Sequence, residues 1–296
     1  MAPSAKDSIE AVGVVGAGTM GHGIAHVLLR HGFAVAIDDT SNQILDDATD
    51  KISKGLARDV EKGRLTREER EKALARLKTT THLGDFAAVD LVVEAVIEKF
   101  EAKAEIFRAL EAGALASRPE VIFASNTSSI SITRLAAETR RPARFVGLHF
   151  FNPVPVMTFV EVIAGLETAP QTVEVAVALA ASLGKTPIRA NDFPGFVSNR
   201  VLMPMINEAI FALMEGVADA EGIDQVMKLG MNHPMGPLEL ADFIGLDVCR
   251  DIMKVLYEGF HDSKSRPCPL PEKMVSAGRV GRKSGRAFYD YSQAKG

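Results

Sequence analysis

The stretch VGVVGAGTMGHGIAHVLLRHG, residues 12–32, decides the fold of this chain. It begins with a short apolar run typical of a buried β-strand and continues with the apolar periodicity of a helix. Between the two stand Gly16, Gly18 and Gly21, in the spacing G-x-G-x-x-G. The first glycine permits a tight turn, the second lets a ligand approach the backbone, and the third lets the helix pack closely on the strand. The stretch therefore predicts a strand–turn–helix unit whose helix N-terminus can hold a phosphate group.

A second feature makes this prediction specific for a dinucleotide. The apolar run FAVAIDD, residues 33–39, places Asp38 about 20 residues beyond the glycines, where an acid binds the ribose 2′-hydroxyl of NAD. Asp38 and Asp39 would together repel the 2′-phosphate of NADP, so we predict NAD as the cofactor. The backbone groups expected to hold its phosphates belong to Gly16, Gly18, Thr19, Met20 and Gly21. A glycine-rich turn in another kind of α/β protein is the alternative.

The bulk composition is that of a globular chain of one large or two medium domains. It has 296 residues, 47% of them hydrophobic, with a net charge of −4 that gives no sign of a nucleic-acid or membrane-surface partner. The N-terminal residues MAPSAKDSIE lack the features of a secretory or transit signal. Cys249 and Cys268 form no metal-binding pattern, and His22 and His26 lack a third ligand. We expect a cytoplasmic protein without a metal.

The chain after Asp39 predicts a doubly wound α/β domain followed by helices. A polar stretch over 41–77 is expected to be helical. The expected strands span residues 89–96, 120–129, 143–151 and 158–165, and the helices among them span 98–115 and 130–139. From residue 194 onward only helices and turns are indicated. We therefore expect an α/β fold with a Rossmann-type NAD-binding domain over 1–190 and an all-helical C-terminal domain over 191–296.

Two groups of polar residues in the first domain have two interpretations each. The cluster Ser125–Ser129, which includes Asn126 and Ser128, follows a predicted strand at the edge where open α/β sheets bind ligands. Its hydroxyls and amide are suited to substrate or nicotinamide contacts, and equally to helix capping. The basic residues Lys51, Lys54, Arg58 and Lys62 share one helix face. This face is either simply solvated or a docking surface for an anionic ligand.

The segment GLHFFNPVPVMTFVEVIAG, residues 147–165, is strongly apolar yet contains His149 and Glu161. The linker Asn152–Pro155 is too short for a crossover helix, so the two flanking strands are expected to run antiparallel as neighbours. That return brings Glu161 towards His149, where a carboxylate can fix the imidazole tautomer and stabilise the imidazolium. The alternative is a core histidine that is satisfied by a backbone group.

With these residues in place, the chain resembles the L-3-hydroxyacyl-CoA dehydrogenase family, and within it the stand-alone 3-hydroxybutyryl-CoA dehydrogenases. The resemblance runs nearly from end to end. Besides the glycine motif, it rests on FASNTSS (123–129), GLHFFNPVPVMTFVEVI (147–163), DFPGFVSNR (192–200), MGPLELADFIGLD (235–247) and GRKSGRAFYDY (281–291).

The resemblance implies NAD-dependent oxidation of an (S)-3-hydroxyacyl-CoA to a 3-ketoacyl-CoA and the reverse reduction, as in fatty-acid and butanoate metabolism, including β-oxidation. It implies that His149 is the catalytic base and Glu161 its partner, and that Ser128 and Asn199 contact the substrate. The positions that match cofactor contacts are Asp38, Glu98, Lys103 and Asn152, to which the amide of Asn126 is added. It further implies that the acyl-CoA tail meets the face of Lys51, Lys54 and Arg58, and that the C-terminal domain forms a homodimer.

Two other functions fit parts of the pattern. A dehydrogenase of free hydroxy acids or sugar acids would share the glycine motif, but we would not expect it to contain HFFNPVPVM. A non-catalytic NAD-binding structural protein would share the whole fold. The intact residues His149, Glu161, Ser128 and Asn199 argue against this second alternative.

Overall fold

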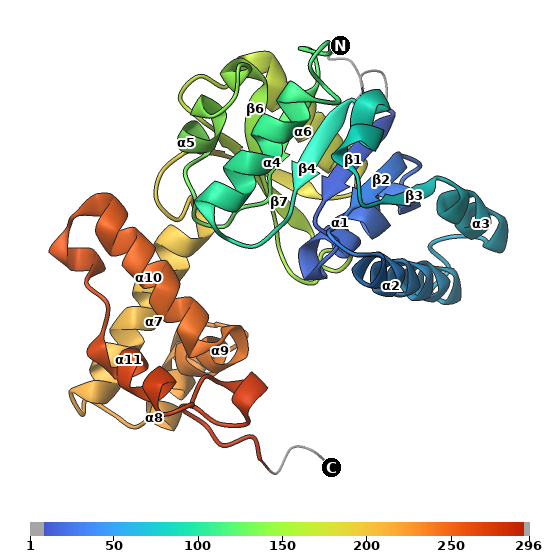
Figure 1. Cartoon of the computed structure of the whole chain (residues 1–296). Helices are drawn as coiled ribbons and strands as arrows, with labels where there is room; N and C mark the ends of the chain where they lie inside the picture. The colour runs from blue at the N-terminus through green and yellow to red at the C-terminus, as the bar shows by residue number, and fades with distance from the viewer. Residues whose placement is uncertain (1–8, 293–296) are drawn as a thin grey trace. The chain divides into compact units, whose positions relative to one another are not determined.

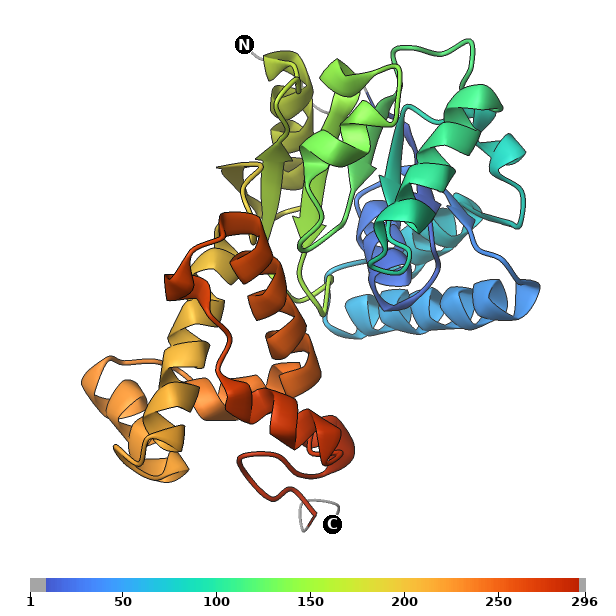
Figure 2. The same cartoon turned by 60° about the vertical axis from the view of Figure 1, so that its left-hand side comes forward.

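The computed structural model describes residues 9–292, so residues 1–8 of the N-terminal segment considered above lie outside it. The chain divides into two compact units that meet between Phe193 and Pro194. The first unit is built on an eight-stranded sheet with helices on both faces, and the second is helical (Figures 1 and 2). The predicted α/β fold with a Rossmann-type NAD-binding domain and a helical C-terminal domain is confirmed.

The sheet has the strand order β3-β2-β1-β4-β5-β6-β7-β8. The six strands β1 to β6 run parallel, whereas β7 pairs antiparallel with β6 and parallel with β8. The antiparallel return predicted for the 147–165 segment is therefore confirmed. The strands are β1 (Ala11–Val15), β2 (Ala34–Asp38), β3 (Leu77–Thr80), β4 (Leu91–Glu94), β5 (Ile122–Ser125), β6 (Phe145–Phe150), β7 (Phe159–Ala164) and β8 (Thr186–Asn191).

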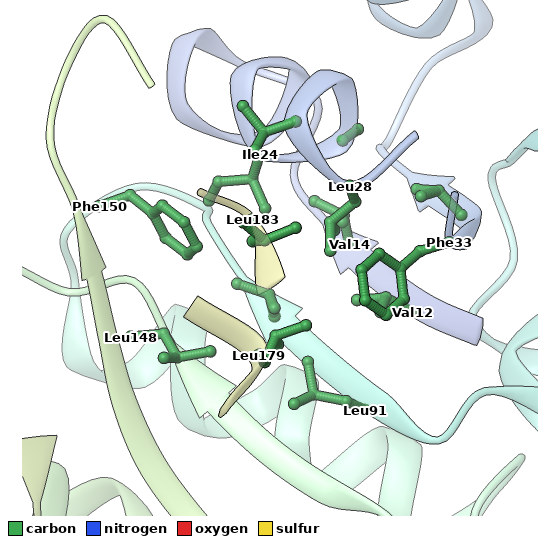
Figure 3. Close-up of a cluster of buried hydrophobic side chains, with 14 of the residues drawn as sticks. Val12, Val14, Ile24, Leu28, Phe33, Leu91, Leu148, Phe150, Leu179 and Leu183 are labelled. Carbon is green, nitrogen blue, oxygen red and sulfur yellow. The ribbon is translucent and has the colours of Figure 1, made fainter. Parts of the chain in front are cut away.

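One face of the sheet carries the main hydrophobic core. Apolar side chains of the helices α1 and α6 pack there against every second residue of the central strands, because alternate strand residues point to the same face (Figure 3). The helices of this unit are α1 (Thr19–Arg30), α2 (Asn42–Glu61), α3 (Arg67–Ala75), α4 (Phe100–Ala112), α5 (Ile132–Ala137) and α6 (Pro170–Ser182), with the 3-10 segments η2 (Leu83–Ala88) and η3 (Pro142–Arg144).

The opposite face is covered by α4 and holds an aromatic cluster. The ring of Phe107 on α4 lies 4.7 Å from that of Phe145 and 5.2 Å from that of Phe123, centroid to centroid. All three rings are fully buried, and such ring contacts add to the hydrophobic burial of each side chain. This packing fixes β5 and β6 side by side, with their carboxyl ends at the same edge.

The stretch 41–77 is mostly helical, as predicted, but it forms two separate helices, and a strand that is not predicted, β3, begins at its last residue, Leu77. The helix α2 ends at Glu61, a turn with Gly63 at φ +67° follows, and α3 begins after the capping box of Thr66 and Glu69. The missed strand β3 lies at the sheet edge and has no apolar alternation in LKTT. Polar edge strands of this kind carry little periodic signal.

Of the two histidines on α1, His26 has a packing role. His26 is buried, and its Nε2 lies 2.8 Å from the carboxylate of Asp59 on α2. Arg30 and Arg64 also contact Asp59. This group ties α2 to the helix that begins at the glycine motif. Within residues 9–292, no group of three or more His, Cys, Asp or Glu side chains is arranged to hold a metal ion.

The second unit has its own hydrophobic core, formed by α7, α9, α10 and α11. The buried Asp242 organises its C-terminal segment, because its carboxylate accepts hydrogen bonds from the N–H groups of Phe288 and Tyr289. Its elements are α7 (Ser198–Met214), α8 (Ala220–Gln225), the π segment η4 (Val226–Gly230), α9 (Pro237–Ile244), α10 (Leu246–Phe260), η5 (Ser263–Ser265), α11 (Pro269–Ser276) and η6 (Arg282–Ser284). None of the helices within residues 9–292 has the combined length and apolar character needed to cross a lipid bilayer.

Candidate active site

His149 and Glu161 face each other across the β6–β7 pair, directly opposite in register. His149 is 6% exposed and Glu161 is 1% exposed. Nδ1 of His149 lies 2.8 Å from Oε2 of Glu161. An ionised carboxylate only accepts hydrogen bonds, so the imidazole donates from Nδ1. Nε2 is then the nitrogen whose lone pair can take up a proton. The juxtaposition predicted from the sequence is confirmed.

The sheet face on which the pair lies explains how two polar side chains can be placed in so apolar a segment. Leu148 and Phe150 point to the opposite face, into the main core. On the face of the pair, the ring of Phe151 contacts the imidazole at 4.3 Å between centroids and also contacts Phe159. The aromatic rings limit access of water to one side of the imidazole, and the carboxylate provides the hydrogen bond that burial requires.

Asn126 joins the carboxyl ends of β5 and β6 at this edge of the sheet. Its Oδ1 accepts a hydrogen bond from the backbone N–H of Phe150 at 2.9 Å, and the residue is only 9% exposed. Because β5 and β6 are parallel, the residues that follow β5 lie at the same edge as His149. Asn126 therefore fixes the position of the segment 127–129, which contains Ser128, relative to the strand that carries the histidine.

Two carboxylates and one lysine hold the same segment from the other side. Lys103, which is 1% exposed, places Nζ 2.7 Å from Oε1 of Glu94 and 3.2 Å from Oε2 of Glu98. Glu94 also accepts a hydrogen bond from the hydroxyl of Ser125. Lys103, predicted as a cofactor contact, thus has its ammonium group directed to the buried Glu94 and the exposed Glu98.

Glu98 receives most of the hydrogen bonds that the 127–129 segment donates. Its Oε1 accepts from the backbone N–H groups of Ser128 and Ser129 at 2.9 and 3.1 Å, and from the hydroxyl of Thr127. Burial by itself would raise the pKa of Glu98, but Lys103 and these hydrogen bonds outweigh it and lower the pKa. Glu98 is therefore held as a carboxylate beside Ser128.

Part of the hydroxyl cluster caps the local backbone, as one of its two interpretations predicts. Ser131, just after the cluster, caps α5 by accepting from the N–H of Arg134, and Thr127 accepts from the N–H of Ile130. These hydroxyls shape the loop. Ser128 is half-buried, and its hydroxyl lies 3.3 Å from Glu98.

The glycine motif forms the turn that its spacing predicts. Gly16 has φ +95°, which side chains of L-residues rarely adopt, and a Cβ on Gly21 would lie 1.7 Å from the carbonyl oxygen of Gly16. At Gly18 a Cβ would meet nothing within 4 Å. Within residues 9–292, no protein group accepts a hydrogen bond from the N–H groups of Thr19, Met20 or Gly21. The first turn of α1 thus offers N–H donors to a phosphate in open space.

The two aspartates after β2 have separate positions. Asp39 accepts a hydrogen bond from the N–H of Ala17 at 2.7 Å and so braces the glycine turn. The carboxylate of Asp38 receives no hydrogen bond from the described residues. Burial, followed by the charge of Asp39, raises the pKa of Asp38 to about 6. Asp38 is therefore the aspartate whose carboxylate can accept a ribose hydroxyl.

The remaining predicted site residues lie at more separate places. Asn152 is exposed in the turn between β6 and β7. The basic face of α2 is solvent-exposed at Lys51, Lys54 and Arg58. Asn199 is buried in the first turn of α7, in the second unit.

Asp39 and Glu94 take part in this geometry, although local patterns in the sequence predict no protein contact for either of them. Their positions in the chain carry a weak signal, because Asp39 follows the strand next to the glycine turn and Glu94 ends an otherwise apolar strand. Buried carboxylates need partners, and here the partners are backbone N–H, hydroxyl and ammonium groups.

Comparison with known proteins places both units in one family. Residues 11–193 match the model of the 3-hydroxyacyl-CoA dehydrogenase NAD binding domain, and residues 195–291 match the model of the 3-hydroxyacyl-CoA dehydrogenase C-terminal domain. Together the two matches cover nearly the whole chain.

Individual relatives give the same result at high similarity. A probable 3-hydroxybutyryl-CoA dehydrogenase of Deinococcus radiodurans is 56% identical, over 94% of this chain and 99% of the relative. A 3-hydroxybutyryl-CoA dehydrogenase of Bradyrhizobium diazoefficiens is 54% identical, over 97% of each chain. The crystal structure of (S)-3-hydroxybutyryl-CoA dehydrogenase from Ralstonia eutropha superposes with a TM-score of 0.92 at 49% identity, covering 97% of this chain and 100% of that one.

Proposed function

This chain belongs to the 3-hydroxyacyl-CoA dehydrogenase family of NAD-binding oxidoreductases, and we propose that it interconverts (S)-3-hydroxybutyryl-CoA and acetoacetyl-CoA. The observation that carries the proposal is the buried His149–Glu161 pair at the same sheet edge as the glycine turn. A proton-transfer group and a dinucleotide cradle at one edge are what an alcohol dehydrogenase requires. The short acyl chain is supported by the activities named for the relatives.

The residues of the first unit fit NAD at two points. The N–H groups of Thr19, Met20 and Gly21 have no acceptor among the described residues, and the space beside Gly18 is open, which suits a pyrophosphate. Asp38 can accept the ribose hydroxyls, and its charge opposes a 2′-phosphate. Glu98, Lys103, Asn126 and Asn152 are the further proposed contacts near the nicotinamide. When bound, NAD supplies the acceptor for the hydride that leaves C3 of the substrate.

His149 is the proposed general base for oxidation and general acid for reduction. Its Nε2 takes the proton of the substrate hydroxyl, while Nδ1–H remains bonded to Glu161. The carboxylate stabilises the imidazolium that forms and keeps the ring in one tautomer. The buried position of both side chains strengthens this interaction, because little water screens it.

The substrate is proposed to contact both units. Ser128 binds the reacting oxygen, supported by the fixed position that Glu98 and Asn126 give to its loop. Asn199 contacts the substrate from α7, and the basic face of Lys51, Lys54 and Arg58 on α2 receives the phosphates of CoA. Cationic side chains on a solvent-exposed surface bind such groups mainly by charge.

The proposed domain roles follow from the same reasoning. Residues 1–190 form the NAD-binding domain, and residues 191–296 form a substrate and dimerisation domain. A homodimer is supported by large exposed apolar side chains in the second unit, among them Val217, Val226, Leu229, Met231 and Phe243. The free, buried thiols of Cys249 and Cys268 are compatible with a reducing compartment, which we propose to be the cytoplasm.

The proposed reaction is tested by measuring the oxidation of NADH with acetoacetyl-CoA and with acetoacetate under the same conditions. We expect turnover of the CoA thioester and at most weak turnover of the free acid. Comparable kcat/KM values for the two would favour a dehydrogenase of free acids instead. A parallel series with NADPH tests the role of Asp38, and equal use of both cofactors would contradict it.

A further inference from the structure

Lys185 is a buried cation that the proposed mechanism does not use. It lies between α6 and β8 and is 6% exposed. Its Nζ donates hydrogen bonds to the carbonyl oxygens of Val154 at 2.7 Å and Met157 at 2.6 Å. Within residues 9–292, it forms no ion pair with a carboxylate, and burial, followed by the charge of Arg30, lowers its pKa to about 8. Burying a lysine whose ammonium group binds only backbone carbonyls costs folding free energy. We therefore expect a function of Lys185 in the contacts that it makes.

Both carbonyls belong to the turn of residues 152–157, which joins β6 to β7. The turn is closed by hydrogen bonds from the N–H groups of Val156 and Met157 to the carbonyl of Pro153. Among the described residues, no backbone N–H donates to the carbonyls of Val154 and Met157. Without the ammonium group, these two acceptors would lose the partner that the protein provides.

The turn also rests on the helix of the glycine motif. Val154 is 1% exposed and belongs to the main core, and a Cβ on Gly23 of α1 would lie 3.0 Å from the side chain of Val154. Gly23 is two residues beyond the last glycine of the dinucleotide motif. The backbone of the turn is therefore held from one side by Lys185 and supported on the other by α1.

We propose that Lys185 is a positioning residue for catalysis, which holds the 152–157 turn on α1 and thereby aligns Asn152 and the His149–Glu161 pair with the dinucleotide cradle. The inference rests on the proposed function, in which these residues act on one substrate. Lys185 touches neither substrate nor cofactor in this account. It acts through the turn, because His149 and Glu161 lie on the two strands that the turn connects.

Lys185→Met tests this role, because methionine fills similar space but donates no hydrogen bond. With acetoacetyl-CoA and NADH, we expect kcat to fall on the order of 10-fold or more, since small misplacements of reacting groups are costly. KM for acetoacetyl-CoA should change less than about 3-fold, because the CoA-binding face lies elsewhere. The Kd for NADH should rise several-fold, as Asn152 and α1 lose their common support.

Thr172→Val is the matched control for a purely structural effect. Thr172 is 1% exposed and lies in the first turn of α6, the helix that precedes Lys185. Its hydroxyl donates a part-buried hydrogen bond to the carbonyl of Ala143 at 2.8 Å, just before β6 begins. The substitution therefore removes a hydrogen bond to a backbone carbonyl at the end of the sheet opposite to His149. We expect a lowered Tm but a kcat and an NADH Kd within about 2-fold of the wild type.

Two outcomes would overturn the inference. One is a folded Lys185→Met variant with kcat and NADH Kd within about 2-fold of the wild type. The other is an equal loss of kcat in Lys185→Met and Thr172→Val at equal loss of Tm. If Lys185→Met is not recovered folded, Lys185→Gln decides by the same criteria, because its amide falls about 1.5 Å short of the two carbonyls.

The same measurements separate this inference from the proposed function. Reduction of acetoacetyl-CoA by the wild type tests the reaction itself. If the wild type lacked that activity, the NADH Kd of the variants would still decide the role of Lys185, because it depends on no particular substrate. A raised Kd in Lys185→Met and Lys185→Gln, but not in Thr172→Val, would support the positioning role.

Discussion

The β6–β7 hairpin and the glycine turn before α1 lie at the same edge of the sheet, yet they differ in whether their polar groups have hydrogen-bond partners within the protein. In the hairpin, His149 and Glu161 are buried, and their side chains form a hydrogen bond with each other. In the glycine turn, the first N–H groups of α1 and the carboxylate of Asp38 have no hydrogen-bond partner among the described residues. Folding alone forms the hydrogen bond of the hairpin, whereas the glycine turn has donors and an acceptor available for a ligand.

The difference follows from what each region must do in the proposed reaction. A proton-transfer pair must keep one geometry through the reaction, so its orientation is best fixed before substrate binds. A cofactor site must gain free energy when the ligand arrives, and partners already supplied by the protein would reduce that gain. Substitutions in the hairpin should therefore change turnover, and substitutions in the cradle should change affinity.

The largest effect is expected from His149→Gln, which removes the proposed general base. We expect kcat for acetoacetyl-CoA to fall by about 10²–10⁴-fold, the usual contribution of general acid–base catalysis. The Kd for NADH, measured by fluorescence titration, should stay within about 2-fold, because His149 is not part of the cradle. Near-normal turnover would show that another group transfers the proton.

Glu161→Gln should have the next largest effect. The amide oxygen can still accept from Nδ1–H, but the charge that stabilises the imidazolium is lost, so we expect kcat to fall roughly 10–100-fold, from about 1.5–3 kcal/mol for a charged hydrogen bond. KM for acetoacetyl-CoA should be largely unchanged. Glu174→Gln on α6 is the control, since Glu174 is an exposed partner of Arg189. A main effect on KM would assign Glu161 to substrate binding instead.

Gly18→Ala should weaken the cradle without affecting the fold. A Cβ here enters open space, and the residue has φ −62°, which alanine adopts readily. The methyl group would occupy the space proposed for the pyrophosphate, so we expect the Kd for NADH to rise roughly 10–30-fold at unchanged Tm, the equivalent of about 1.4–2 kcal/mol. Gly84→Ala, also in open space but within η2, should change neither quantity. An unchanged Kd in Gly18→Ala would place the phosphates elsewhere.

The smallest effect in this series is a pH dependence of cofactor binding. With a pKa of about 6, Asp38 is mostly ionised at pH 7 and mostly protonated at pH 5. Because the ribose hydroxyl donates to the charged form, affinity is lost as the pH falls through about 6, and the Kd for NADH should rise about 10-fold from pH 7 to pH 5. In Asp38→Asn the Kd should be higher and nearly flat over this range. A flat profile in the wild type would mean that Asp38 does not contribute through its charge.

Much of this arrangement could be predicted from local patterns in the chain. The glycine spacing predicts a tight turn with a positive φ at Gly16, and the proline-containing linker is too short for a crossover helix, so both regions are encoded within about 20 residues each. The strand β3 could not be predicted, because LKTT has no alternation and pairs only at the edge of the sheet. The break between α2 and α3 is not predicted, because the charged pattern continues across Gly63.

Local patterns in the sequence also do not predict the direction in which buried charged side chains point. The Lys103 ammonium group contacts Glu94, nine residues earlier, and Glu98, and the sequence around Lys103 does not predict this pair of contacts. Lys185 has no unusual sequence neighbours, and its carbonyl partners lie about 30 residues away. Such contacts depend on which elements pack together, so no periodicity in the chain reveals them.

The sequence by itself determined the dinucleotide cradle, the hairpin with His149 and Glu161, and the family to which they belong, because each is set by residues close together in the chain. Only the tertiary structure decided how these parts are held in register. Asn126 joins the ends of β5 and β6, Glu98 holds the loop of Ser128, and Lys185 holds the turn above α1. These side chains are buried, and a buried polar group must find its partner wherever the fold brings one within reach.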